Sequence, residues 1–110
     1  MNLRLEILSP QEIFYNGEVD LCIFPGIEGD IGILKNHMPF LTTLRTGIIF
    51  LYKEKKIIDT FLVNGGIIEV SNNVCTLLTE DIIKTSEISE HEKEEFDKLK
   101  SKAMEKFYYT

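Results

Sequence analysis

The chain has 110 residues, the length of one domain, and its 44% hydrophobic content is sufficient for a packed core, which excludes a disordered chain. Its 12 basic and 18 acidic residues give a net charge of -6, which disfavours nucleic acid and anionic membrane surfaces as partners. No apolar run approaches the roughly 20 residues of a membrane-spanning helix. Arg4 and Glu6 interrupt the N-terminal apolar residues, so we expect no signal peptide and a chain that stays in the compartment where it is made.

The region from residue 2 to 82 contains short runs of Ile, Val, Leu, Phe and Thr, separated at close intervals by turn residues. This texture is typical of an all-β sandwich or barrel. Cys22 and Cys75 each stand alone inside an apolar run, without Cys-x-x-Cys spacing, and are predicted to be buried free thiols.

Residues 25–40, PGIEGDIGILKNHMPF, combine three glycines with two carboxylates and a histidine. A phosphate loop is excluded, because no lysine directly follows the last glycine and Glu28 and Asp30 would repel an anion. A catalytic carboxylate pair needs burial to separate its two pKa values, whereas glycines on both sides predict an exposed loop. His37 has no second metal ligand at a suitable spacing. We therefore predict no catalytic residue, no cofactor site and no metal site here, but a rigid surface for docking a protein partner.

The later part of the β region predicts a meander. Strands are expected on both sides of residues 53–56, with another after Asn64, Gly65 and Gly66 and a last one after Asn72 and Asn73. The runs GIIFLY and IIDTFLV are almost continuously apolar. They favour strands with one face in the core and the other against a partner.

The texture changes after residue 84, where good helix formers replace the strand pattern. Ser89 and Glu92 fit a capping box at the start of a helix. Apolar residues then recur at helical spacing and form one stripe: Phe96, Leu99, Ala103, Met104 and Phe107. The sequence therefore predicts a β-sandwich domain over residues 1–84 and a C-terminal helix over residues 85–110.

Three motifs carry a resemblance to a known family. They are GDIGIL at residues 29–34, a histidine two residues before Pro39, and two glycines at 65 and 66 ahead of Glu69 and Val70. From residue 3 to about 107 the chain resembles the epsilon subunit of bacterial-type rotary (F-type) ATP synthases. The resemblance implies a flattened β-sandwich of two five-stranded sheets, followed by a short α-helical region.

The resemblance also implies a function. Family members are non-catalytic subunits of the central stalk that link the gamma subunit to the c-ring and couple proton flow to ATP synthesis. The alpha and beta subunits are further candidate partners, and the complex places the subunit peripherally on the cytoplasmic face of the bacterial inner membrane. By correspondence with the family, Glu28, Gly29 and Asp30 are expected to face the c-ring. The residues expected to face gamma are Ser9, His37, Met38 and Thr42.

The sequence departs from the family in its regulatory part. Some bacterial members bind ATP through an Asp and an Arg in the helical region, and the matching residues 88–93 contain neither. Only three residues follow Phe107, where fuller members have a second helix that blocks ATP hydrolysis. We therefore expect no ATP sensing and weak or absent inhibition. Two alternatives from other classes are a stand-alone β-sandwich protein-binding module and a small hydrolase that uses Glu28 and Asp30.

Overall fold

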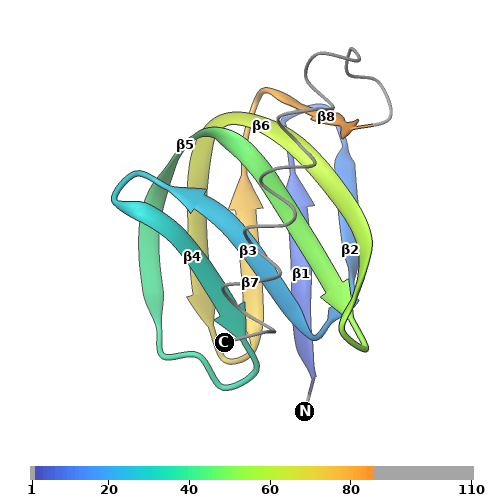
Figure 1. The fold of residues 1–110 in the computed structure, drawn as a ribbon. Helices are drawn as coiled ribbons and strands as arrows, with labels where there is room; N and C mark the ends of the chain where they lie inside the picture. Colours follow the sequence, from blue (N-terminus) through green and yellow to red (C-terminus); the bar gives the residue numbers. More distant parts are fainter. Residues whose placement is uncertain (1, 86–110) are drawn as a thin grey trace.

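The computed structural model describes residues 2–85, drawn in colour in Figure 1. The predicted C-terminal helix, and with it the proposed division into two domains, falls on residues outside this part of the chain. The mainly β prediction is confirmed over the described residues, which form the strands β1 (Leu3–Leu8), β2 (Ile13–Val19), β3 (Leu21–Gly26), β4 (Gly29–Leu34), β5 (Phe40–Lys53), β6 (Lys56–Ser71), β7 (Val74–Leu78) and β8 (Ile82–Lys84).

The strands form one hydrogen-bonded sheet in the order β2-β1-β7-β6-β5-β3-β4, with β8 paired to β6. All neighbours are antiparallel except β1 and β7, which are parallel. The connections after β5 and β6 are the tight turns that the sequence predicts. Glu54 and Lys55, and again Asn72 and Asn73, have positive φ angles, as the two-residue turns of β-hairpins require.

Two long strands run through both layers of the sandwich. β5 has 14 residues and β6 has 16, and Figure 1 shows both curving from one layer into the other. The first layer holds β2, β1 and β7 with the start of β5 and the end of β6, and the second holds β4, β3 and β8 with the remainder of both. The prediction of two separate five-stranded sheets is therefore corrected: each layer has five strand segments, but the hydrogen bonding is continuous between them.

Gly65 and Gly66 provide the bend in β6. Their φ angles are +90° and +146°, which glycine adopts far more readily than other residues. A Cβ atom on Gly66 would lie 2.8 Å from the carbonyl oxygen of Leu78, so no larger residue fits without movement of the backbone. The sequence predicted that a strand ends here and a new one begins. That prediction is wrong, because β6 continues through the glycines and remains paired to β5 on both sides of them.

The main core lies between the two layers. It follows from the alternation of apolar residues along each strand, as in β1, where Leu3, Leu5 and Ile7 point inward. Cys22 and Cys75 are both fully buried free thiols in this core, as predicted.

A second apolar cluster lies on the other face of β3 and β5. Its buried members are Leu21, Ile23, Ile48, Phe50 and Tyr52. This cluster accounts for the nearly continuous apolar run GIIFLY, since residues on both faces of the strand are buried. The second face was predicted to be covered by a partner, but it is already buried within the chain itself.

Candidate functional site

The acidic loop is the tip of the β3–β4 hairpin. Gly26 and Gly29 pair at its base, and Ile27 and Glu28 form the turn between them. A Cβ atom on Gly26 would lie 2.5 Å from the carbonyl oxygen of Gly29, so this close approach of the two strands requires glycine. Ile27 is 62% exposed and Glu28 is also exposed. The hairpin therefore presents an apolar side chain and a carboxylate side by side at its tip.

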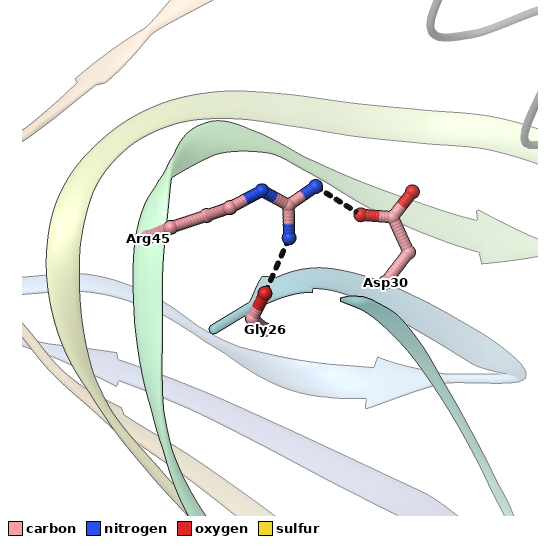
Figure 2. Close-up of polar contacts among 3 residues, drawn as sticks. All are labelled: Gly26, Asp30 and Arg45. Atoms are coloured by element: carbon pink, nitrogen blue, oxygen red, sulfur yellow. Dashed lines mark hydrogen bonds and ion pairs between the residues drawn. The ribbon is translucent and has the colours of Figure 1, made fainter. Parts of the chain in front are cut away.

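Arg45 of β5 holds the base of this hairpin, as Figure 2 shows. Its Nη2 lies 2.7 Å from Oδ1 of Asp30, and its Nη1 donates a hydrogen bond to the carbonyl oxygen of Gly26. One guanidinium group therefore contacts both strands of the hairpin. Asp30 is engaged within the chain, whereas Glu28 has no ion-pair partner among the described residues. The sequence analysis missed Arg45. The pairing of β3 with β5 brings Arg45 close to Asp30, and this pairing cannot be predicted from the spacing of residues in the sequence.

This geometry disfavours the alternative of a small hydrolase that uses Glu28 and Asp30 as an acid/base pair. Glu28 and Asp30 are both accessible to solvent, and the charge of Asp30 is compensated by Arg45. Such an exposed ion pair is typical of a structural contact rather than of an acid/base pair. Within residues 2–85 no three His, Cys, Asp or Glu side chains gather in a way that could hold a metal ion. In the same part of the chain, no helix has the length and apolar character to cross a membrane.

The residues expected to face gamma lie along the whole length of the first layer. Ser9 is at one end, in the turn after β1, where its backbone and side chain both bond to Glu12. His37 and Met38 are at the other end, next to Asn36, whose backbone N–H donates to Asn73 in the β6–β7 turn. The His37 ring contacts Phe40 edge-on, with 5.8 Å between the ring centroids.

Thr42 has a different position from the other three. It pairs with Ile68, a buried core residue, so the Thr42 side chain shares the inward face and is only partly exposed. Its neighbours Leu41 and Thr43 are on the outward face of β5 and are exposed.

An exposed apolar surface joins the two ends of the first layer. We call it the outer face: the outward side chains of β1, β7, the start of β5 and the end of β6. Leu8, Leu78 and Ile67 are paired across three neighbouring strands in one row of this face. Leu78 is 54% exposed and Ile67 47%, and Leu41 in the adjacent row is 67% exposed. Exposed apolar residues on adjoining strands are typical of protein contact surfaces. Sequence reasoning missed them, because strand alternation alone does not distinguish an apolar outer face from the core.

Comparison with known proteins gives matches over most of the chain. The profile of the family described as "ATP synthase, Delta/Epsilon chain, beta-sandwich domain" matches residues 2–85. An ATP synthase epsilon chain of Chlorobium limicola is 43% identical over 79 residues, which cover 72% of this chain and 90% of that protein. An ATP synthase epsilon chain of Gluconacetobacter diazotrophicus is 33% identical over 89 residues, which cover 81% of this chain but only 63% of that protein.

The fold is also shared with solved structures. A chain of the Euglena gracilis mitochondrial ATP synthase, OSCP/F1/c-ring, superimposes with a TM-score of 0.74 at 24% identity, over 93% of this chain and 64% of that one. A chain of the central stalk/c-ring of the Tetrahymena thermophila mitochondrial ATP synthase gives a TM-score of 0.68 at 17% identity, over 79% of this chain and 69% of that one. At these identities the likeness shows the fold alone. Because the family profile covers the whole described β-sandwich, the chain belongs to the ATP synthase delta/epsilon family.

Proposed function

We propose that this chain is the epsilon subunit of a rotary ATP synthase, a non-catalytic part of the central stalk that joins the gamma subunit to the c-ring. The observation that carries the proposal is the family match over residues 2–85. The two structural neighbours belong to assemblies that contain a c-ring, which supports the same partner for this chain. In this role the chain couples proton flow to ATP synthesis and lies at the cytoplasmic face of a bacterial inner membrane through its complex.

The β3–β4 hairpin is the surface that we assign to the c-ring. Ile27 and Glu28 project from its tip, and Arg45 fixes its base through Asp30 and Gly26. We propose that the carboxylate of Glu28, which has no ion-pair partner among the described residues, complements basic groups on the loops of the ring. Such charge complementarity favours register and association rate more than affinity. Asp30 acts through Arg45, so it positions the hairpin rather than providing a second free charge.

The outer face is the surface that we assign to gamma. It runs from the turn at Ser9 to the loop at His37 and Met38, and Leu41, Ile67 and Leu78 are exposed between these ends. These apolar side chains supply the desolvated contacts that stabilise an interface, and the polar residues at both ends form its rim. In this proposal the two partners bind different layers of the sandwich, with the c-ring on the hairpin of the second layer.

Co-purification of the tagged full chain with gamma and the c-ring in mild detergent tests the proposal. We expect both partners to be retained by the wild-type chain. Leu41→Glu should lose gamma, because it places a charge on the outer face, whereas Ile58→Glu should keep it, because Ile58 is an exposed residue of β6 in the second layer. Circular dichroism establishes that both variants are folded. If neither partner co-purifies with the wild-type chain, a stand-alone binding module becomes the better description.

A further inference from the structure

The sequence contains two Asn-Gly pairs, Asn16–Gly17 in β2 and Asn64–Gly65 in the bend of β6. Asparagine is among the chemically least stable residues of proteins. It is most reactive before glycine, because glycine has no Cβ atom to obstruct an attack by its backbone nitrogen on the preceding side chain. Since both pairs have the same chemistry, a difference in their reactivity in the folded chain comes from the surrounding structure.

The Asn64 side chain is held on both sides. Its Oδ1 accepts a hydrogen bond from the Thr46 hydroxyl, and its Nδ2 donates one to the Asp81 carboxylate at 3.1 Å. The Asn64 backbone N–H also donates to the Asp81 carbonyl oxygen at 3.0 Å. β6 lies between β5 on one side and β7 and β8 on the other, so its backbone is paired along both edges. The Asn64 amide is therefore fixed toward Thr46 and Asp81.

Asn16 has none of these restraints. It is exposed, and its side chain makes no hydrogen bond to any residue in the described range 2–85. β2 stands at the end of the sheet, and among the described strands it pairs only with β1. An edge strand opens more readily than a strand that is paired on both sides, because fewer hydrogen bonds hold it. The backbone at Asn16 can therefore leave its extended conformation while the rest of the sandwich stays folded.

The packing of Tyr15 favours glycine at position 17. A Cβ atom on Gly17 would lie 3.3 Å from the Tyr15 hydroxyl oxygen, closer than most Cβ atoms approach another heavy atom. The Tyr15 ring in turn contacts Phe61 of the main core edge-on, with 6.4 Å between the ring centroids. The residue that makes Asn16 reactive is therefore also the one that leaves room for this aromatic contact.

We propose that Asn16 is a site of spontaneous deamidation in the folded chain. The backbone nitrogen of Gly17 attacks Cγ of Asn16 and forms a new N–Cγ bond, which closes a succinimide ring. The side-chain amide nitrogen leaves as ammonia and takes the proton of the Gly17 N–H with it. Water then opens the ring at either carbonyl group, which gives aspartate or isoaspartate. The inference concerns the chain alone and does not depend on the proposed function.

Both products alter the edge of the first layer. Asn16 is paired with Glu6 across β1 and β2, so either product places a carboxylate opposite the carboxylate of Glu6. Like charges directly opposite each other destabilise a strand pair. Isoaspartate also adds a methylene group to the main chain, which interrupts the register of β2 between residues 16 and 17. Deamidation therefore weakens the pairing of β2 with β1.

Peptide mass spectrometry of the full chain, incubated in mildly alkaline buffer, measures both sites in one sample. We expect Asn16 to deamidate several-fold faster than Asn64 in the folded chain. In the chain unfolded by urea the two rates should be similar, because the two sites share the Asn-Gly sequence. Equal rates in the folded chain, a faster reaction at Asn64 or an unreacted Asn16 would overturn the inference. The same several-fold difference in urea would also overturn it, since the fold would then not be the cause.

Thr46→Val tests the restraint on Asn64. It removes the hydroxyl that donates to the Asn64 side chain and keeps a side chain of similar shape. Deamidation at Asn64 should accelerate several-fold, while the rate at Asn16 should not change. Circular dichroism establishes that the variant is folded. An unchanged rate at Asn64 would show that this hydrogen bond does not protect the residue.

Asn16→Gln is the control for the effect on the strand, because glutamine forms the corresponding cyclic imide far more slowly. After incubation, the urea midpoint of the wild-type chain should fall, and amide hydrogen exchange in β2 should become faster. The incubated Asn16→Gln chain should keep the midpoint that it had before incubation. An equal fall in both proteins would show that another reaction is responsible, and an unchanged wild-type midpoint despite deamidation would contradict the weakened pairing of β2 with β1.

Discussion

The guanidinium of Arg45 lies 2.7 Å from the carboxylate of Asp30, so the hairpin that carries Glu28 is attached at its base to β5. Both side chains are partly exposed, at 44% and 37%. Exposed ion pairs contribute about 0 to 1 kcal/mol to the free energy of unfolding, so we expect only a small contribution from the ion pair between Arg45 and Asp30. The ion pair instead orients the β3–β4 hairpin relative to β5, because the same guanidinium also contacts the Gly26 carbonyl oxygen in the other strand of the hairpin.

The first prediction concerns this ion pair. Arg45→Ala and Asp30→Ala should each change the free energy of unfolding by less than about 1 kcal/mol. Both variants should lower the rate of proton-driven ATP synthesis in membrane vesicles. The double variant should lower this rate no further than either single variant, because the two residues act as a unit. Asp30→Lys should lower synthesis further, since it places an ammonium group beside Arg45.

Glu28→Gln serves as the comparison, because it removes the free charge and leaves the Arg45 contact intact. Western blotting of the isolated complex ensures that the variants are compared at equal assembly. Unchanged synthesis with Asp30→Lys at equal assembly would count against a c-ring role for the hairpin.

The second prediction concerns the bend in β6. Gly66→Ala should lower the free energy of unfolding by about 2 to 3 kcal/mol, because its Cβ atom meets the Leu78 carbonyl oxygen and its φ angle is positive. Gly29→Ala should have a smaller effect, about 1 kcal/mol, since Gly29 also has a positive φ angle but no atom lies within 4 Å of the position that its Cβ would take. Urea denaturation measures both values, and equal midpoints would contradict the packing explanation.

The third prediction is a pH dependence from the core. Burial raises the pKa of the Cys22 thiol well above its usual value, and the adjacent Cys75 raises it further. In the unfolded chain the thiol titrates near its usual pKa of about 8.5. Above that pH the unfolded state binds fewer protons than the folded state, so stability falls as pH rises, whereas below it the contribution is fully present.

Denaturant midpoints between pH 7 and about 9.5 test this prediction, in a range that lies below the usual titration of tyrosine. Cys22→Ala should be less stable at every pH, because the removed sulfur leaves a cavity. Its stability should nevertheless decline less steeply above about pH 8.5 than that of the wild-type chain. An equally steep decline in both proteins would show that Cys22 is not its source.

The fourth prediction concerns regulation and rests on the sequence of the C-terminal residues. Deletion of residues 88–110 should leave ATP hydrolysis by the reconstituted complex nearly unchanged, as expected for weak or absent inhibition. A rise of several fold on deletion would show that this segment is inhibitory. The matched measurement is ATP synthesis by the same complex, which reports whether the deletion has disturbed assembly.

Much of the fold was predictable from local chemistry. Asn72 and Asn73 tolerate positive φ angles, so their turn was visible in the sequence, as was the burial of both cysteines. The two glycines at 65 and 66 were predicted to form a turn between two strands, because the same residues suit a turn and a sharply bent strand. Only the pairing with β5 on both sides of the bend distinguishes the two cases.

The candidate surfaces were predictable only in part. The exposed tip at Glu28 followed from its flanking glycines. The contact between Asp30 and Arg45 did not, because it depends on the register between strands that are distant in sequence. Similarly, the sequence does not show that Leu41 and Ile67 are exposed, which becomes clear only when the strands are paired and both residues are found on the outer face.

Because β5 and β6 each pass through both layers, the two layers are joined covalently as well as by packing. A shear force applied to one layer reaches the other along two covalent backbones as well as through side-chain packing. Sliding of the layers past each other would require the breaking of strand pairs in the bend, whereas close-packed side chains alone would resist it less. If gamma binds the outer face and the c-ring binds the β3–β4 hairpin, as we propose, the two continuous strands carry the torque between them through the backbone.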